Sequence, residues 1–206
     1  VFVEVARERK DRVADHALVV LQRHGSTRSL PALEAIARRQ EAERADSVTH
    51  AIDAIQWRQV IQESKGKPSV EQLRWALDRV AIAEDAKKFI REQGGWPLEE
   101  IRRGVEEMGT TGRDACVEVL RSTIAQAEHR EDALRLAHEL SNIRSDTHVR
   151  NSAVWLVAQF GTDDDRKVLA DRAQRIRSTE PAGRTNDEWR ELNILESALK
   201  RARDFK

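Results

Sequence analysis

The sequence contains one segment twice, once near each end of the chain. Residues 13–25, VADHALVVLQRHG, align without a gap on residues 149–161, VRNSAVWLVAQFG. Apolar or small residues coincide at every fourth position, close to the spacing of one face of a helix. The matched pairs are Val13 with Val149, Ala17 with Ala153, Leu21 with Val157 and Gly25 with Gly161, then Leu33 with Leu169 and Ala37 with Ala173. Such a self-match is typical of stacked two-helix repeats.

A shorter match indicates repetition at closer range. Residues 16–22, HALVVLQ, resemble residues 50–56, HAIDAIQ, which lie 34 positions further along. Only 9 Gly and 4 Pro interrupt the 206 residues, and Ala, Leu, Glu and Arg favour helices over strands. We therefore predict an all-α fold of about ten helices, arranged as stacked antiparallel αα-hairpins.

Local signals predict several helix boundaries. The first helix is expected over residues 5–24, ended by Gly25 in the left-handed conformation that often follows a helix. A later helix is expected over residues 46–63. The stretches SVEQ at 69–72 and TNDE at 185–188 have the form of capping boxes, which predicts a helix start at each.

Two glycine-rich stretches predict corners. GGWP at 94–97 is the strongest helix-breaking stretch within the sequence, and Pro97 suits the first turn of the following helix. GTTG at 109–112 is expected to be a turn between helices. Apolar spacing places Val168 and Trp189 on the buried stripes of the last two helices.

Two stretches resemble the HEAT and armadillo-like helical repeat family. They are SDTHVRNSAVWLVAQFG at 145–161 and, less closely, DRVADHALVVLQRHG at 11–25. In that family the second helix of a unit often follows an Asp and a Val-Arg pair and ends in Gly. The resemblance covers roughly residues 11–60 and 113–178. It implies a short HEAT-like α-solenoid, a curved stack whose second helices line the concave surface.

On this interpretation residues 1–206 form a single helical-repeat domain. The section at about 69–108 departs from the repeat spacing and is expected to be irregular repeats or an insertion. Because the sequence begins with Val, we expect the domain to be excised from a larger chain.

Three consecutive aspartates, Asp163, Asp164 and Asp165, are the densest group of carboxylates in the sequence. Thr162 and Asp165 have the spacing of a capping box, and carboxylates in a first turn complement the positive end of the helix dipole. Neighbouring side chains in a first turn spread around the axis and do not converge on one ion. We interpret the triplet as a helix start and predict no metal site.

Other residues with reactive side chains do not form a familiar catalytic or metal motif. The zinc-protease pattern that begins at His138 has Asn142 where the second histidine belongs. Cys116 is the only cysteine and lies on an apolar stripe, which predicts a buried thiol and fits a reducing compartment. GTTGR at 109–113 lacks the preceding strand and the Gly-Lys-Ser/Thr ending of a P-loop, so it is interpreted as a turn, with anion binding at the next helix start as an alternative. We predict no catalytic, cofactor-binding or metal-binding residues.

One stripe on a predicted second helix faces away from the apolar stripe. Ser152, Trp155 and Gln159 form it, and Trp is enriched in binding hot spots. We predict that these three residues contact a partner. The alternative is that neighbouring repeats bury Trp155.

The charge balance bears on the class of partner. Lys+Arg and Asp+Glu both total 36, whereas a nucleic-acid binder or a protein held on a membrane surface would show a basic excess. Arginine outnumbers lysine 28 to 8, which suits carboxylate or phosphate recognition, but the base composition of the genome explains this bias more simply. Acidic residues are interleaved with the arginines, as on a solvated helix surface. There is no apolar run of about 18 residues, and we expect a cytoplasmic protein.

These observations lead to a hypothesis of a non-catalytic helical-repeat interaction module that binds a protein partner or another domain of its parent chain. One alternative is a nucleic-acid-binding domain, including the HEAT-like fold of alkyl-base DNA glycosylases. Another is a structural or sensor arm of a larger bacterial multidomain protein. Salt-dependent binding of DNA would distinguish the nucleic-acid alternative from the others.

Overall fold

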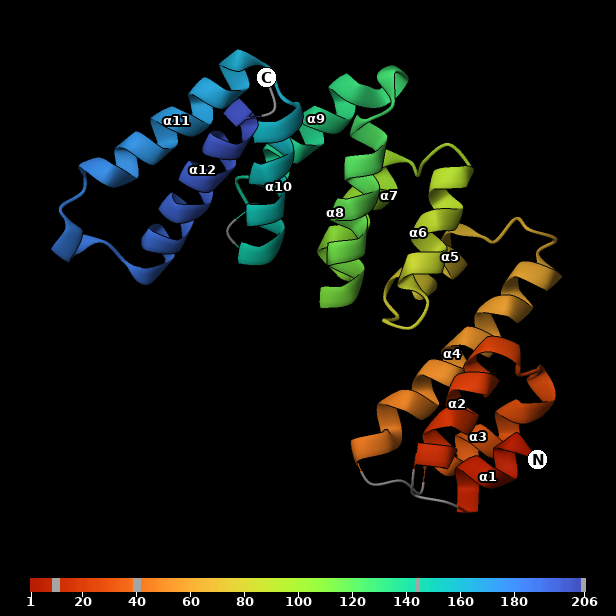
Figure 1. The fold of residues 1–206 in the computed structure, drawn as a ribbon. Helices are drawn as coiled ribbons and strands as arrows, with labels where there is room; N and C mark the ends of the chain where they lie inside the picture. Colours follow the sequence, from red (N-terminus) through yellow and green to blue (C-terminus); the bar gives the residue numbers. More distant parts are fainter. Residues whose placement is uncertain (9–11, 39–41, 144, 205–206) are drawn as a thin grey trace. The chain divides into compact units, whose positions relative to one another are not determined.

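The structure is a computed structural model that describes residues 1–8, 12–38, 42–143 and 145–204. In these ranges all regular secondary structure is helical, with twelve α-helices, three short 3₁₀ turns and no strand (Figure 1), which confirms the all-α prediction. None of the described helices is both long enough and apolar enough to cross a membrane. The α-helices are α1 (Phe2–Glu8), α2 (Arg12–His24), α3 (Leu30–Ala37), α4 (Ala42–Glu63), α5 (Val70–Leu77), α6 (Ala83–Glu92), α7 (Leu98–Glu107), α8 (Thr110–Ile124), α9 (Arg130–Leu140), α10 (Thr147–Phe160), α11 (Asp163–Ser178) and α12 (Asn186–Asp204).

The chain divides into two compact units. Unit 1 comprises residues 1–89 and 109–112, and unit 2 comprises residues 90–108 and 113–206. In unit 1, α1 packs against α2, and both α2 and α3 pack against α4 around fully buried Leu33 and Val48. The predicted first helix is therefore two helices packed on each other, and residues 9–11 of the predicted span lie outside the described residues.

In unit 2 the helices α9 to α12 pack in an overlapping series. α9 packs against α10, α11 packs against α12, and α10 also contacts both α11 and α12, while α7 contacts α9 (Figure 1). The apolar stripes of α8 and α9 are buried throughout. Their residues are Ala115, Cys116, Val119, Leu120, Thr123 and Ile124 on α8, and Ala133, Leu136, Ala137 and Leu140 on α9.

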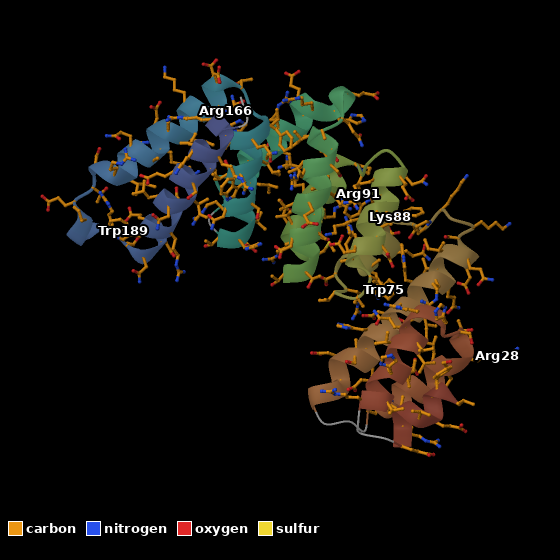
Figure 2. The ribbon with its side chains drawn as sticks, viewed as in Figure 1. Arg28, Trp75, Lys88, Arg91, Arg166 and Trp189 are labelled. Atoms are coloured by element: carbon orange, nitrogen blue, oxygen red, sulfur yellow. The ribbon has the colours of Figure 1, made fainter. Side chains whose placement is uncertain are left out.

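Two residues predicted to be buried are exposed instead. Val168 is 57% exposed because its neighbour Leu169, about 100° around the helix, occupies the inward position and is 2% exposed. Trp189 is 39% exposed and lies beside the guanidinium of Arg184, whose Cζ is 4.6 Å from the ring centroid. Figure 2 shows Trp189 near the start of α12. Apolar spacing alone therefore overestimated the buried stripes of the last two helices.

The aligned glycines Gly25 and Gly161 end their helices in the same way. The Gly25 amide donates to the carbonyl oxygen of Leu21 (2.7 Å), and the Gly161 amide donates to that of Val157 (2.9 Å). A Cβ added to either glycine would lie 2.5 Å from that same oxygen. The left-handed conformation predicted for Gly25 was wrong, because the glycines with positive φ in the described residues are Gly66, Gly94 and Gly95. The close approach of a backbone carbonyl oxygen explains why both positions are glycine.

Arginine side chains cap the C-terminal ends of several helices. Arg58 donates to the carbonyls of Gln22 (2.6 Å) and Gly25 (2.8 Å) at the end of α2, and Arg166 donates to Ala158 near the end of α10 (3.0 Å; Figure 2 labels Arg166). A guanidinium can reach two carbonyls at once, and its charge complements the negative helix end. This use accounts for part of the arginine excess. The same contact is made by Arg113 to Met108, Arg130 to Phe160, Arg172 to Ser141 and Arg184 to Arg177.

A second arginine contact joins successive even-numbered helices of unit 2. Arg113 on α8 pairs with Asp146, the N-cap of α10 (2.9 Å), and Arg150 on α10 pairs with Glu191 on α12 (3.9 Å). Arg113 and Arg150 are each the fourth residue of their helix. The same position therefore carries the same type of contact in α8 and α10.

Candidate functional site

The aspartate triplet forms the start of α11. Asp165 accepts a hydrogen bond from the Thr162 amide (2.6 Å), and the Thr162 hydroxyl accepts one from the Asp165 amide (3.2 Å), which confirms the predicted capping box. Asp163 pairs with Arg166 (2.8 Å). In the part of the chain that the structure describes, no three His, Cys, Asp or Glu side chains gather as metal ligands would.

Asp165 also contacts the preceding odd-numbered helix. Its second carboxylate oxygen lies 2.8 Å from Nε2 of His138 on α9. Partial burial raises the pKa of Asp165, but the hydrogen bonds from Thr162 and the contact with His138 outweigh it, so the pKa is lower than usual. The triplet is therefore a helix cap that also links α9 to α11.

The GTTGR segment belongs mainly to a helix. α8 begins at Thr110, so the predicted turn at 109–112 is shorter than expected, and Gly112 lies in the first turn of the helix. The Gly112 amide donates to Oδ1 of Asp78 (3.1 Å), within unit 1. The negative group at this helix start is thus a carboxylate of the same chain.

Cys116 packs as a small apolar residue. It is fully buried on α8, and its sulfur lies 3.9 Å from that of Met108. This agrees with the prediction of a buried thiol and gives no access to a substrate.

The three residues predicted to contact a partner lie together on the surface of unit 2. Trp155 and Ser152 are partly buried and Gln159 is exposed, whereas Ala153 and Leu156 on the same helix are buried. Trp155 is therefore accessible, and its role in partner binding stays a prediction.

Trp155 and Gln159 line a hollow of about 300 Å³ between three even-numbered helices. α8 contributes Arg121, and the three lining residues from α12 are Ala198, Arg201 and Ala202. The Cζ atom of Arg201 lies 5.9 Å from the centroid of the Trp155 ring, and the buried alanines are small enough to leave space beside that ring.

An adjacent hollow of about 270 Å³ extends toward the starts of α8 and α10. It shares Arg121, Trp155 and Gln159 with the first. The residues that line only this second hollow are Asp114, Val117 and Glu118 from α8, and His148, Ser152 and Leu156 from α10. We call the two hollows together the α10 groove. All of its lining residues belong to unit 2.

Ser152, His148 and Asp114 are residue types of a catalytic triad, and all three line the second hollow. The His148 nitrogen near Asp114 is Nε2 (3.2 Å), and both side chains are substantially exposed, at 67% and 43%. No hydrogen bond joins Ser152 to His148 among the described residues. The set therefore lacks the hydrogen-bonded nucleophile and base that a serine hydrolase needs.

Comparisons with protein-family models, curated proteins and solved structures found no match. The α10 groove is therefore interpreted from its own chemistry. Its first hollow offers an indole ring, two guanidinium groups and small apolar residues, and its second hollow adds two carboxylates and a histidine.

Proposed function

We propose that this chain is a non-catalytic helical-repeat interaction module, and that its α10 groove binds a protein partner or another domain of a longer chain. The accessibility of Trp155, between two hollows lined by three helices, is the observation that carries the proposal. Trp and Arg are among the residues most enriched in binding hot spots, and Trp155, Arg121 and Arg201 line the same hollow.

The packing in unit 2 supports a HEAT-like stack as the framework of the groove. In this proposal α9–α10 and α11–α12 are successive hairpins, and α8, α10 and α12 are the second helices of their units. The arginine contacts at equivalent positions of α8 and α10 fit a repeating unit, as do the equivalent helix ends at Gly25 and Gly161. Second helices of such stacks line an extended binding surface.

The charges of the groove favour a protein over a nucleic acid. Arg121 and Arg201 line the first hollow, but Asp114 and Glu118 line the second hollow together with Arg121. A nucleic-acid strand carries a phosphate at every nucleotide, so its backbone would meet these carboxylates when it extended along the groove. A protein segment can place groups of different charge along its length.

Site-specific photo-crosslinking in the cells that make the protein tests this proposal. A photoreactive residue at Gln159 should capture a specific protein, and the same residue at exposed Arg175 on α11, outside the groove, should not. The capture should disappear when Trp155→Ala is added. Equal capture from both positions would contradict the proposal, as would salt-dependent binding of DNA that requires Arg121 and Arg201.

A further inference from the structure

We infer that the α10 groove recognises a short protein segment in which one carboxylate side chain adjoins a bulky apolar side chain. This inference rests on the proposed function and adds the chemistry of the partner. It follows from the two guanidinium groups beside the Trp155 ring, from the acidic far end, and from the length of the groove.

The two groove arginines have donors to spare. Other arginines of unit 2, such as Arg166 and Arg172, are occupied by helix carbonyls and carboxylates. By contrast, Arg121 and Arg201 form no salt bridge with any residue in the described ranges, and both are exposed. A guanidinium matches the two oxygens of a carboxylate with a planar pair of hydrogen bonds, so a partner's Asp or Glu suits this end of the groove.

Apolar side chains line the hollow beside the two arginines. The Trp155 ring and the side chains of Ala198 and Ala202 line the same hollow as Arg121 and Arg201. A hollow of about 300 Å³ has room for a large aliphatic or aromatic side chain against the indole. The apolar side chain of the partner should therefore lie next to its carboxylate.

The opposite end of the groove limits the partner to one negative group. Asp114 lies seven residues before Arg121 on α8, which corresponds to about 10 Å along the helix. An extended segment covers that distance in about three residues. A second carboxylate at that separation would face Asp114, whereas a neutral or basic side chain would not be repelled.

The length of the groove limits the size of the segment. From His148 to Gln159 the groove follows α10 for 11 residues, or about 16 Å. About five extended residues span this distance. The partner segment is therefore a short motif with one acidic residue and not a long polyanion such as a nucleic acid.

A display library of random seven-residue peptides, selected on the full chain, tests the inference. Peptides retained by the wild-type protein and lost with Trp155→Ala should be enriched in Asp or Glu next to Leu, Phe or Trp. In a synthetic copy of a selected peptide, replacing the acidic residue by its amide should weaken binding at least about tenfold, as measured by fluorescence polarisation. The double variant R121E/R201E should select Lys or Arg at that position.

Matched variants control the experiment. Trp189→Ala removes an exposed tryptophan that has its own arginine contact outside the groove. Arg175→Glu reverses an exposed charge outside the groove. Neither variant should change the selected peptides. Circular dichroism and thermal unfolding must show that every variant is folded as the wild type is.

The outcomes separate the two proposals. Trp155-dependent peptides without acidic enrichment, or without a response to R121E/R201E, would overturn the carboxylate inference and leave the proposed function in place. A library without Trp155-dependent peptides would overturn the inference of a short segment, and crosslinking from Gln159 tests the proposed function separately. A single-stranded DNA oligonucleotide that displaces the selected peptide would overturn the choice of a protein segment.

Discussion

The guanidinium of Arg201 on α12 lies over the ring of Trp155 on α10, with 5.9 Å between Cζ and the ring centroid. Exposed contacts of this kind contribute about 0.5–1 kcal/mol. We therefore expect Arg201→Gln to lower the free energy of unfolding by no more than about 1 kcal/mol, as measured by urea denaturation. Arg175→Gln is the control and should have no effect. A much larger loss would show that Arg201 is needed for the packing of α12 and is not a groove residue with spare donors.

Gly161→Ala should destabilise the protein by about 2 kcal/mol or more, since something must shift to admit the added methyl group. Its Cβ would lie 2.5 Å from the carbonyl oxygen of Val157 and 2.8 Å from the Cβ of Asp165. Gly183→Ala is the matched control, because its Cβ would find nothing closer than 4.0 Å. Urea denaturation of both variants measures the difference. Equal midpoints would contradict the close-approach explanation for the glycine that ends α10.

Asp146 should support folding at neutral pH and lose this effect in acid. The Val149 amide lowers its pKa most, and Arg113 and the His148 amide lower it further against an opposing effect of burial. A folded-state pKa below the unfolded value of about 3.8 stabilises the protein above that value, and the stabilisation is lost as the pH falls through the folded-state pKa. Asp146→Ala should lower the free energy of unfolding by about 1 kcal/mol or more at pH 7. Asp146→Asn should lower it less, because an amide oxygen still caps the helix. Urea denaturation of the wild type and Asp146→Ala at pH 7 and pH 3 tests this prediction. A difference in the free energy of unfolding that is the same at both pH values would contradict it.

Asp53 on α4 should have the opposite dependence on pH. It is only 5% exposed, and burial raises its pKa more than Arg79 and His50 lower it. A raised folded-state pKa means that stability decreases as the pH rises from the unfolded value through the folded-state pKa. Asp53→Asn should therefore be more stable than the wild type at pH 7, with the difference shrinking toward pH 4. Thermal unfolding of both proteins from pH 4 to pH 7 measures this difference in stability. An Asp53→Asn variant less stable than the wild type at pH 7 would show that neighbouring positive charges stabilise the buried carboxylate.

Features encoded by neighbouring residues could be predicted from the sequence. The capping boxes at Ser69, Thr162 and Thr185 were confirmed because their hydrogen bonds join residues three apart. The first helix was predicted too long because its apolar spacing continues across what are two helices packed on each other. The reason for a glycine at position 25 was also missed, since the atoms that exclude a side chain there include those of Ile55, 30 residues away.

The same distinction applies to the candidate site. Ser152, Trp155 and Gln159 could be predicted as candidates from the sequence because they recur on one helix face, away from its apolar stripe. Arg121 and Arg201 were missed because they reach the groove from α8 and α12, and no local pattern sets them apart from the other arginines. Their role depends on which helices pack together, which helix periodicity does not specify.

The affinity of the partner captured through Gln159, measured by calorimetry with the purified proteins, tests the central claim most directly. We predict that Trp155→Ala weakens binding at least about 30-fold, the effect of losing a hot-spot residue, while Trp189→Ala leaves the dissociation constant within about twofold. Equal dissociation constants for the wild type and Trp155→Ala would show that the α10 groove is not the binding site.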